Sequence, residues 1–99
     1  MKIEYNHNLG KEEAYNRINN LLNKLQDQYK DMISDPQKTW NSTKDEMDFI
    51  VNIKGYHLSG KVYIKDKQIV LEGKLPFVAR MFSGKIKGII KEKLETLLA

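Results

Sequence analysis

The sequence contains no cysteine, which excludes a disulfide framework, a thiolate metal site and a cysteine nucleophile. It has no run of about 18 apolar residues, and Glu4, Asn6 and Asn8 occupy the region where a signal peptide needs an apolar core. We therefore expect a cytoplasmic protein with no transmembrane segment. With 99 residues, the chain is expected to form a single domain, residues 1–99, too small for a large enclosed active site.

The composition is that of a folded protein, with 40% hydrophobic and 30% charged residues and a net charge of +4. Residues 1–49 carry 7 basic and 9 acidic residues, whereas the remainder carries 10 basic and 4 acidic residues. A basic half can attract nucleic acid, but these lysines are spread over several predicted elements and are not interleaved with aromatic residues. A nucleic-acid partner is therefore not expected.

The spacing of apolar residues predicts the secondary structure. Residues 2–7 alternate as a short strand, and residues 9–33 follow one long amphipathic helix that Pro36 is expected to stop. The period then changes to two, which predicts four strands joined by hairpin turns. These strands are expected at residues 37–42, 47–54, 57–65 and 68–75. A second helix follows Pro76, with an apolar side comprising Val78, Phe82, Ile86, Ile90, Leu94 and Leu97 or Leu98.

The order β-α-β-β-β-β-α predicts an α+β two-layer sandwich, in which an antiparallel meander sheet carries two long helices on one face. The other sheet face is then open, and alternation places Ile50, Tyr63 and Val70 on it as a candidate interface, for instance of a homodimer. The C-terminal helix carries Arg80, Lys87 and Lys91 opposite its apolar side. These three residues form a candidate basic face for binding to a surface.

No motif in the sequence supports catalysis or cofactor binding. The segment from Gly55 to Val62 resembles a phosphate-binding loop, but Val62 lacks the required hydroxyl and the segment joins two predicted strands. Neither His7 nor His57 has a second histidine at metal-ligand spacing, and His7 is expected to hydrogen-bond the chain reversal beside it. We therefore expect no catalytic residue, no metal and no cofactor.

Several short motifs resemble those of one protein family. They are His7-Asn8-Leu9-Gly10 with Ala14, then Trp40, Gly60, and Leu75-Pro76-Phe77 leading to Ile86 and a leucine-rich end. Together they run over nearly the whole chain and resemble the polyhydroxyalkanoic acid system proteins of the granule-region family. The resemblance implies a small bacterial protein associated with the granules or machinery of storage polyester, and it brings no catalytic residues.

The leading hypothesis is a non-enzymatic binding protein that associates with polyhydroxyalkanoate granules or granule proteins. The alternative is a homodimeric module that binds a small apolar ligand or a protein partner. An enzyme of unrecognised type remains a third class.

Overall fold

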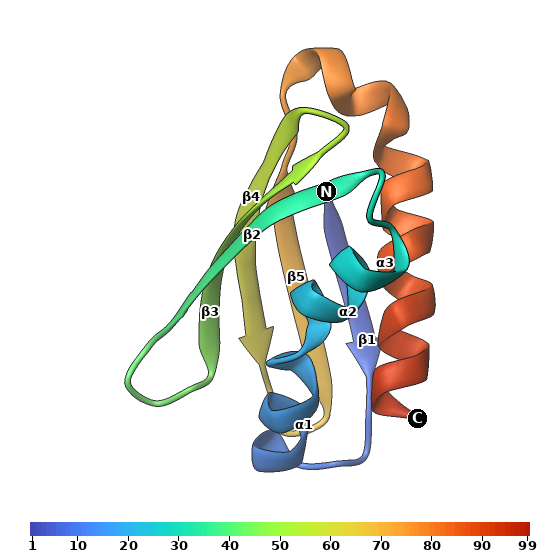
Figure 1. Ribbon diagram of the computed structural model, residues 1–99. Coiled ribbons are helices and arrows are strands. Elements are labelled where there is room, and N and C mark those ends of the chain that lie inside the picture. The colour runs from blue at the N-terminus through green and yellow to red at the C-terminus, as the bar shows by residue number, and fades with distance from the viewer.

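The computed structural model describes residues 1–99 and contains a five-stranded antiparallel sheet with helices packed on one face (Figure 1). The strand order β1-β5-β4-β3-β2 makes β2 to β5 a meander and places β1 beside β5. This arrangement confirms the predicted α+β fold and its order of elements. The elements are β1 (Lys2–Asn6), α1 (Lys11–Ile18), α2 (Leu21–Gln28), β2 (Ile33–Trp40), β3 (Glu46–Ile53), β4 (Tyr56–Ile64), β5 (Gln68–Lys74), the 3-10 helix η1 (Phe77–Phe82) and α3 (Ser83–Leu98).

One hydrophobic core lies between the sheet and the helices. The alternation predicted for β3 is observed, because Met47, Phe49, Val51 and Ile53 are all buried while Asp48 and Ile50 point away. The helices contribute the other half of the core, and their buried residues are Ala14, Ile18, Leu21, Leu22, Leu25, Ile86, Ile90, Leu94 and Leu98.

The first helical region is not one long helix, as predicted, but two helices separated at Asn19 and Asn20. Asparagine is a weak helix former, and both oxygen atoms of Asn19 accept hydrogen bonds from β2. Its side-chain oxygen accepts a hydrogen bond from the Trp40 indole at 2.9 Å, and its backbone oxygen accepts one from Lys38. The break at these two residues therefore lets the apolar faces of α1 and α2 each pack against the sheet.

Pro36 does not stop the helix, which already ends at Gln28, but lies inside β2. A proline is tolerated there because β2 is an edge strand and its pairing with β3 shifts register between Ser34 and Gln37. Asp35 adopts a positive φ of 51° at this bulge. The first strand of the meander therefore starts at Ile33, four residues earlier than predicted.

The segment after Pro76 begins as a 3-10 helix and becomes α-helical only at Ser83. A 3-10 helix repeats every three residues, so Ala79 and Phe82 face inward. Val78, which the α-helical spacing placed in the core, is instead 63% exposed, and that part of the prediction is wrong. The change of helix type therefore turns several apolar side chains toward solvent.

Candidate functional site

The side chain of His7 has a structural role. His7 is buried and bridges two parts of the chain: its Nδ1 accepts the Leu9 N–H at 3.1 Å, and its Nε2 lies 3.0 Å from the Lys65 carbonyl oxygen. Because Nδ1 is the acceptor, Nε2 carries the hydrogen and donates it to Lys65. The prediction that His7 holds the chain reversal is confirmed.

The segment resembling a phosphate-binding loop forms the β3–β4 turn and most of β4, so no helix follows its glycines. Gly55, at φ 84°, makes the turn, and His57 is exposed on β4. No three side chains of His, Asp or Glu gather in a way that could hold a metal ion. The segment therefore lacks the strand-to-helix geometry of a phosphate-binding loop.

The candidate interface on the outer sheet face is divided in two. Tyr63 and Val70 are direct neighbours across β4 and β5, but Ile50 pairs with Ser59, four residues or about 13 Å along β4 from Tyr63. Val70 was expected to be exposed but is only 6% exposed, because Tyr63 and Glu4 flank it on the adjacent strands. The three residues therefore do not form one apolar patch, and their role as an interface stays a prediction.

A row of charged residues separates the two parts of the outer face. Lys61 pairs in register with Asp48 on one side and Glu72 on the other, and its ammonium lies 3.3 Å from Asp48 and 3.9 Å from Glu46. The hydrogen bond and charge of Asp48, together with the charge of Glu46, hold the pKa of Lys61 above its ordinary value. The charge of this lysine is therefore partly balanced by carboxylates on the same face.

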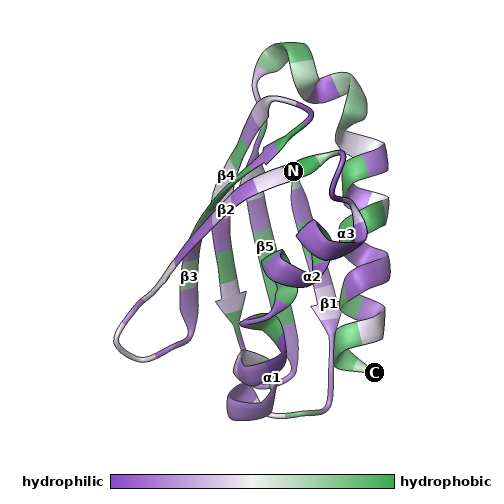
Figure 2. Cartoon of the chain, in the orientation of Figure 1, coloured by the Kyte–Doolittle hydropathy of each residue, from purple (hydrophilic) through white to green (hydrophobic).

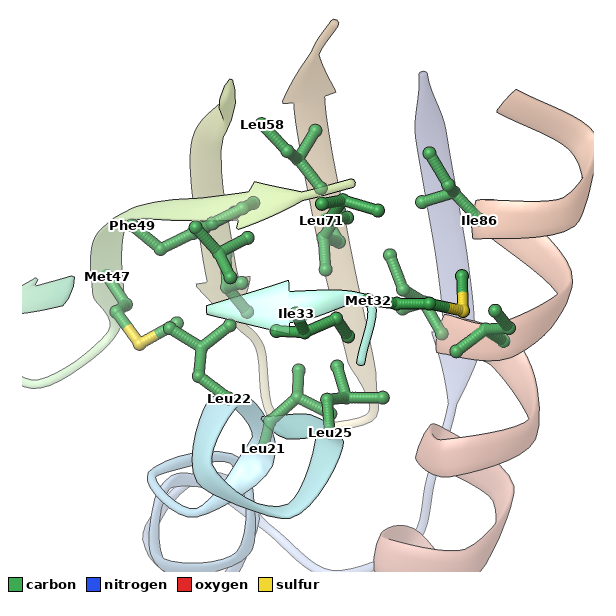
Figure 3. A pocket seen from close by; sticks show the side chains of 15 residues that line it. Leu21, Leu22, Leu25, Met32, Ile33, Met47, Phe49, Leu58, Leu71 and Ile86 are labelled. Atoms are coloured by element: carbon green, nitrogen blue, oxygen red, sulfur yellow. The ribbon is translucent and has the colours of Figure 1, made fainter. Parts of the chain in front are cut away.

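An apolar cavity lies in the core between α2, α3 and the sheet (Figure 3). Its volume is about 30 Å³, and every one of its 15 lining residues is hydrophobic. Ligand pockets in proteins usually measure about 300–1,000 Å³, so this cavity is too small for a drug-sized apolar ligand. A small apolar ligand, as in the alternative hypothesis, would enter this cavity only if the helices moved apart.

The most exposed apolar side chains lie in η1, at one end of the molecule. We call Phe77, Val78 and Met81 the apolar tip; they are 82%, 63% and 82% exposed. In Figure 2, η1 forms the mainly green segment at the top of the molecule, above α3. Sequence analysis missed this site because Val78 fits the apolar spacing of the following helix. The signal available was the run of apolar residues in Phe77–Phe82, interrupted only by Arg80.

The predicted basic face lies next to the apolar tip. Arg80 and Lys91 are exposed and Lys87 is half-buried. Arg80 and Lys87 line an open hollow with Lys74, and the Arg80 guanidinium carbon lies 5.6 Å from the centre of the Phe77 ring. This end of the molecule thus combines exposed apolar groups with positive charge. The use of the face in binding stays a prediction.

The fold and these surfaces define a small α+β protein with exposed apolar and basic side chains at one end. A family model described as "Putative polyhydroxyalkanoic acid system protein" matches residues 1–98. The chain therefore belongs to this family, which confirms the resemblance seen in its motifs. The description names no reaction. No curated protein and no solved structure matches the chain significantly. None of the helices combines the length and the apolar character that a membrane span requires.

The structure explains two of the motifs that carry the family resemblance. In His7-Asn8-Leu9-Gly10, the histidine ring ties the end of β1 to Lys65, and Gly10 enters α1 at φ 80°, where a side chain would be strained. In Leu75-Pro76-Phe77, the proline precedes η1 and its carbonyl accepts the Ala79 N–H at 2.9 Å. The first motif is therefore structural, whereas the second begins the apolar tip.

Proposed function

We propose that this protein is a non-enzymatic member of the polyhydroxyalkanoate system that associates with storage-polyester granules or with proteins on them. The family match over residues 1–98 supports the link to the polyester system. The observation that carries the association is the apolar tip, because soluble proteins rarely leave several large apolar side chains together in water without a binding role. A hydrophobic granule surface would bury these side chains.

The non-enzymatic part of the proposal has its own support. Both ring nitrogens of the buried His7 are hydrogen-bonded to backbone groups. The segment resembling a phosphate-binding loop lies in a strand hairpin. The cavity in the core is lined only by hydrophobic residues and offers no polar group to a reacting substrate. Binding is therefore better supported than chemistry.

The test is the distribution of the protein in a polyester-accumulating bacterium. A tagged copy should sediment with purified granules and should be found in the soluble fraction of a matched strain that lacks the polymer synthase. Equal distribution in the two strains would contradict granule association. A Phe77→Ser/Met81→Ser variant distinguishes the polymer from granule proteins: loss of binding to protein-free polyester particles points to the polymer, whereas loss only on native granules points to a protein partner.

A further inference from the structure

The apolar tip differs from the rest of the surface in its exposure. The only other exposed large hydrophobic residue is Ile50, at 45%, and it stands alone on the outer sheet face. Because residues three apart align along a 3-10 helix, Val78 and Met81 share one side of η1, while Ala79 and Phe82 hold the opposite side against the protein. The tip is thus fixed by its inner residues and presents its outer ones to solvent.

The chain around the tip carries only positive charge. Between Glu72 and Glu92 there is no acidic residue, whereas five basic residues occur. They are Lys74, Arg80, Lys85, Lys87 and Lys91. Such a segment is attracted to a surface of negative charge and gains little from a neutral one.

The basic groups flank the tip on two sides. Lys74, Arg80 and Lys87 line the hollow on one side, and Lys54 and Lys85 line a second, smaller hollow on the other. The Lys54 ammonium lies 5.5 Å from the centre of the Phe82 ring. Both hollows border η1, because Arg80 lines the first and Phe82 lines the second. The long basic side chains there can extend toward a surface that the tip contacts.

The helix α3 cannot itself lie flat on a surface as an amphipathic helix. Its apolar side, with Ile86, Ile90, Leu94 and Leu98, is already buried against the sheet. The apolar groups still available at this end are those of the tip, at the end of the molecule away from the C-terminus of α3 (Figure 1). A protruding tip of this kind fits a lipid surface, which can deform around it, better than it fits the rigid groove of a protein partner.

We propose that the apolar tip inserts into an anionic phospholipid surface, with the flanking lysines and Arg80 contacting the lipid phosphates. The apolar side chains supply burial, and the cations supply attraction that salt weakens. This inference goes beyond granule association, because a phospholipid surface contains no polyester.

The experiment is co-sedimentation of the full chain with vesicles. We expect binding to phosphatidylcholine vesicles that contain about 30% phosphatidylglycerol, and roughly tenfold weaker binding to phosphatidylcholine alone. Raising NaCl from about 0.05 M to about 0.5 M should release the protein. Absence of binding to the anionic vesicles, or equal binding to both vesicle types, would overturn the proposal.

Matched variants locate the contact. Phe77→Ser/Met81→Ser should weaken binding to anionic vesicles by roughly tenfold or more, whereas Ile50→Ser should leave it unchanged. Lys74→Glu/Arg80→Glu should also weaken it, whereas Lys65→Glu/Lys67→Glu, in the distant β4–β5 turn, should have a smaller effect. Circular dichroism melts verify that each variant folds. If the tip variant binds like the wild type, or if tip and control variants lose binding equally, the tip is not the anchor.

The vesicle and granule experiments can fail independently. Sedimentation with granules but not with anionic vesicles would overturn lipid insertion and leave granule association standing. Binding to vesicles through the tip without enrichment on granules would do the reverse.

Discussion

His7 shows how one buried side chain can hold three segments together. Besides its two ring contacts, its backbone N–H donates to the Lys67 carbonyl at 2.9 Å, so the end of β1, the entry to α1 and the β4–β5 turn all meet there. His7→Ala would leave the Leu9 N–H and the Lys65 carbonyl without these partners. We expect a loss of roughly 1–3 kcal/mol in the free energy of unfolding, measured by urea denaturation.

The matched control is His57→Ala, because His57 is exposed on β4 and makes no side-chain hydrogen bond. It should change the free energy of unfolding by less than about 0.5 kcal/mol. Equal urea midpoints for the two variants would show that the contacts of His7 do not contribute to stability.

Two glycines make opposite predictions for the same substitution. A Cβ at Gly60 would lie 1.9 Å from the Glu72 carbonyl oxygen, so Gly60→Ala must push β4 and β5 apart. A Cβ at Gly88, on α3, would meet nothing within 4 Å. We expect Gly60→Ala to destabilise by about 1–3 kcal/mol and Gly88→Ala to stabilise by about 0.5–1 kcal/mol, since alanine favours the helix. Thermal and urea unfolding test both signs, and stabilisation by Gly60→Ala would refute the close approach.

At the scale of the elements, the β2–β3 turn is organised around Asp45. One of its carboxylate oxygens accepts hydrogen bonds from the Asn41 amide and the Thr43 hydroxyl, both at 2.7 Å. The bonds from Asn41 and Thr43 hold the pKa of Asp45 below its ordinary value. A lowered folded-state pKa means that the charged turn stabilises the protein above about pH 4 and loses this contribution as the pH falls through the folded value.

Asp45→Asn should therefore be less stable than the wild type at pH 7, and the difference should shrink below about pH 4. Urea midpoints measured at several pH values provide the test. Asp66→Asn, in the exposed β4–β5 turn, is the matched control and should lower the urea midpoint at pH 7 by less than Asp45→Asn. A difference that grows as the pH falls would contradict the role of Asp45.

The element order was predictable because strand alternation and helical spacing are strong in β3, β4, β5 and most of α3. The break at Asn19 was not, because it depends on Lys38 and Trp40, which lie about 20 residues further on. The start of β2 was not predicted because Pro36 argued against a strand. A proline is tolerated there because β2 lies at the edge of the sheet, which the sequence alone does not reveal. Long-range contacts, rather than local preference, decided both cases.

The candidate site was predicted only in part, for a similar reason. The basic residues Arg80 and Lys91 are exposed as expected, because charged side chains at helical spacing seldom point inward. Val78 was assigned to the core but is 63% exposed, and Val70 was expected to be exposed on the open face but is covered there by its neighbours. The spacing of apolar residues in the sequence reveals neither a change from α-helical to 3-10 geometry nor the burial of a residue by side chains on neighbouring strands.

At the scale of the whole molecule, self-association through the outer sheet face remains to be tested. Tyr63 is half-buried and Val70 is only 6% exposed, so the apolar area of this face is small. The neighbouring Lys61 is paired with Asp48 and Glu46. If two such faces pair, the wild type should sediment as a dimer at high micromolar concentration and Tyr63→Lys should be monomeric. Monomers in both cases would rule out the dimer, and dimers in both would place the contact elsewhere, with the edges β1 and β2 as the next candidates.

The pairing of β1 with β5 has a consequence for the order in which the protein folds during synthesis. Strand β1 is made first, yet its partner, with Ile3 opposite Leu71, leaves the ribosome only after the rest of the meander. Arg17 of α1 must wait longer, because it donates to the Leu97 carbonyl, 80 positions later. Loops of this length close slowly, so the hairpins β2–β3 and β3–β4 are expected to form first. The closure of the sheet and core therefore comes after the hairpins of the meander have formed.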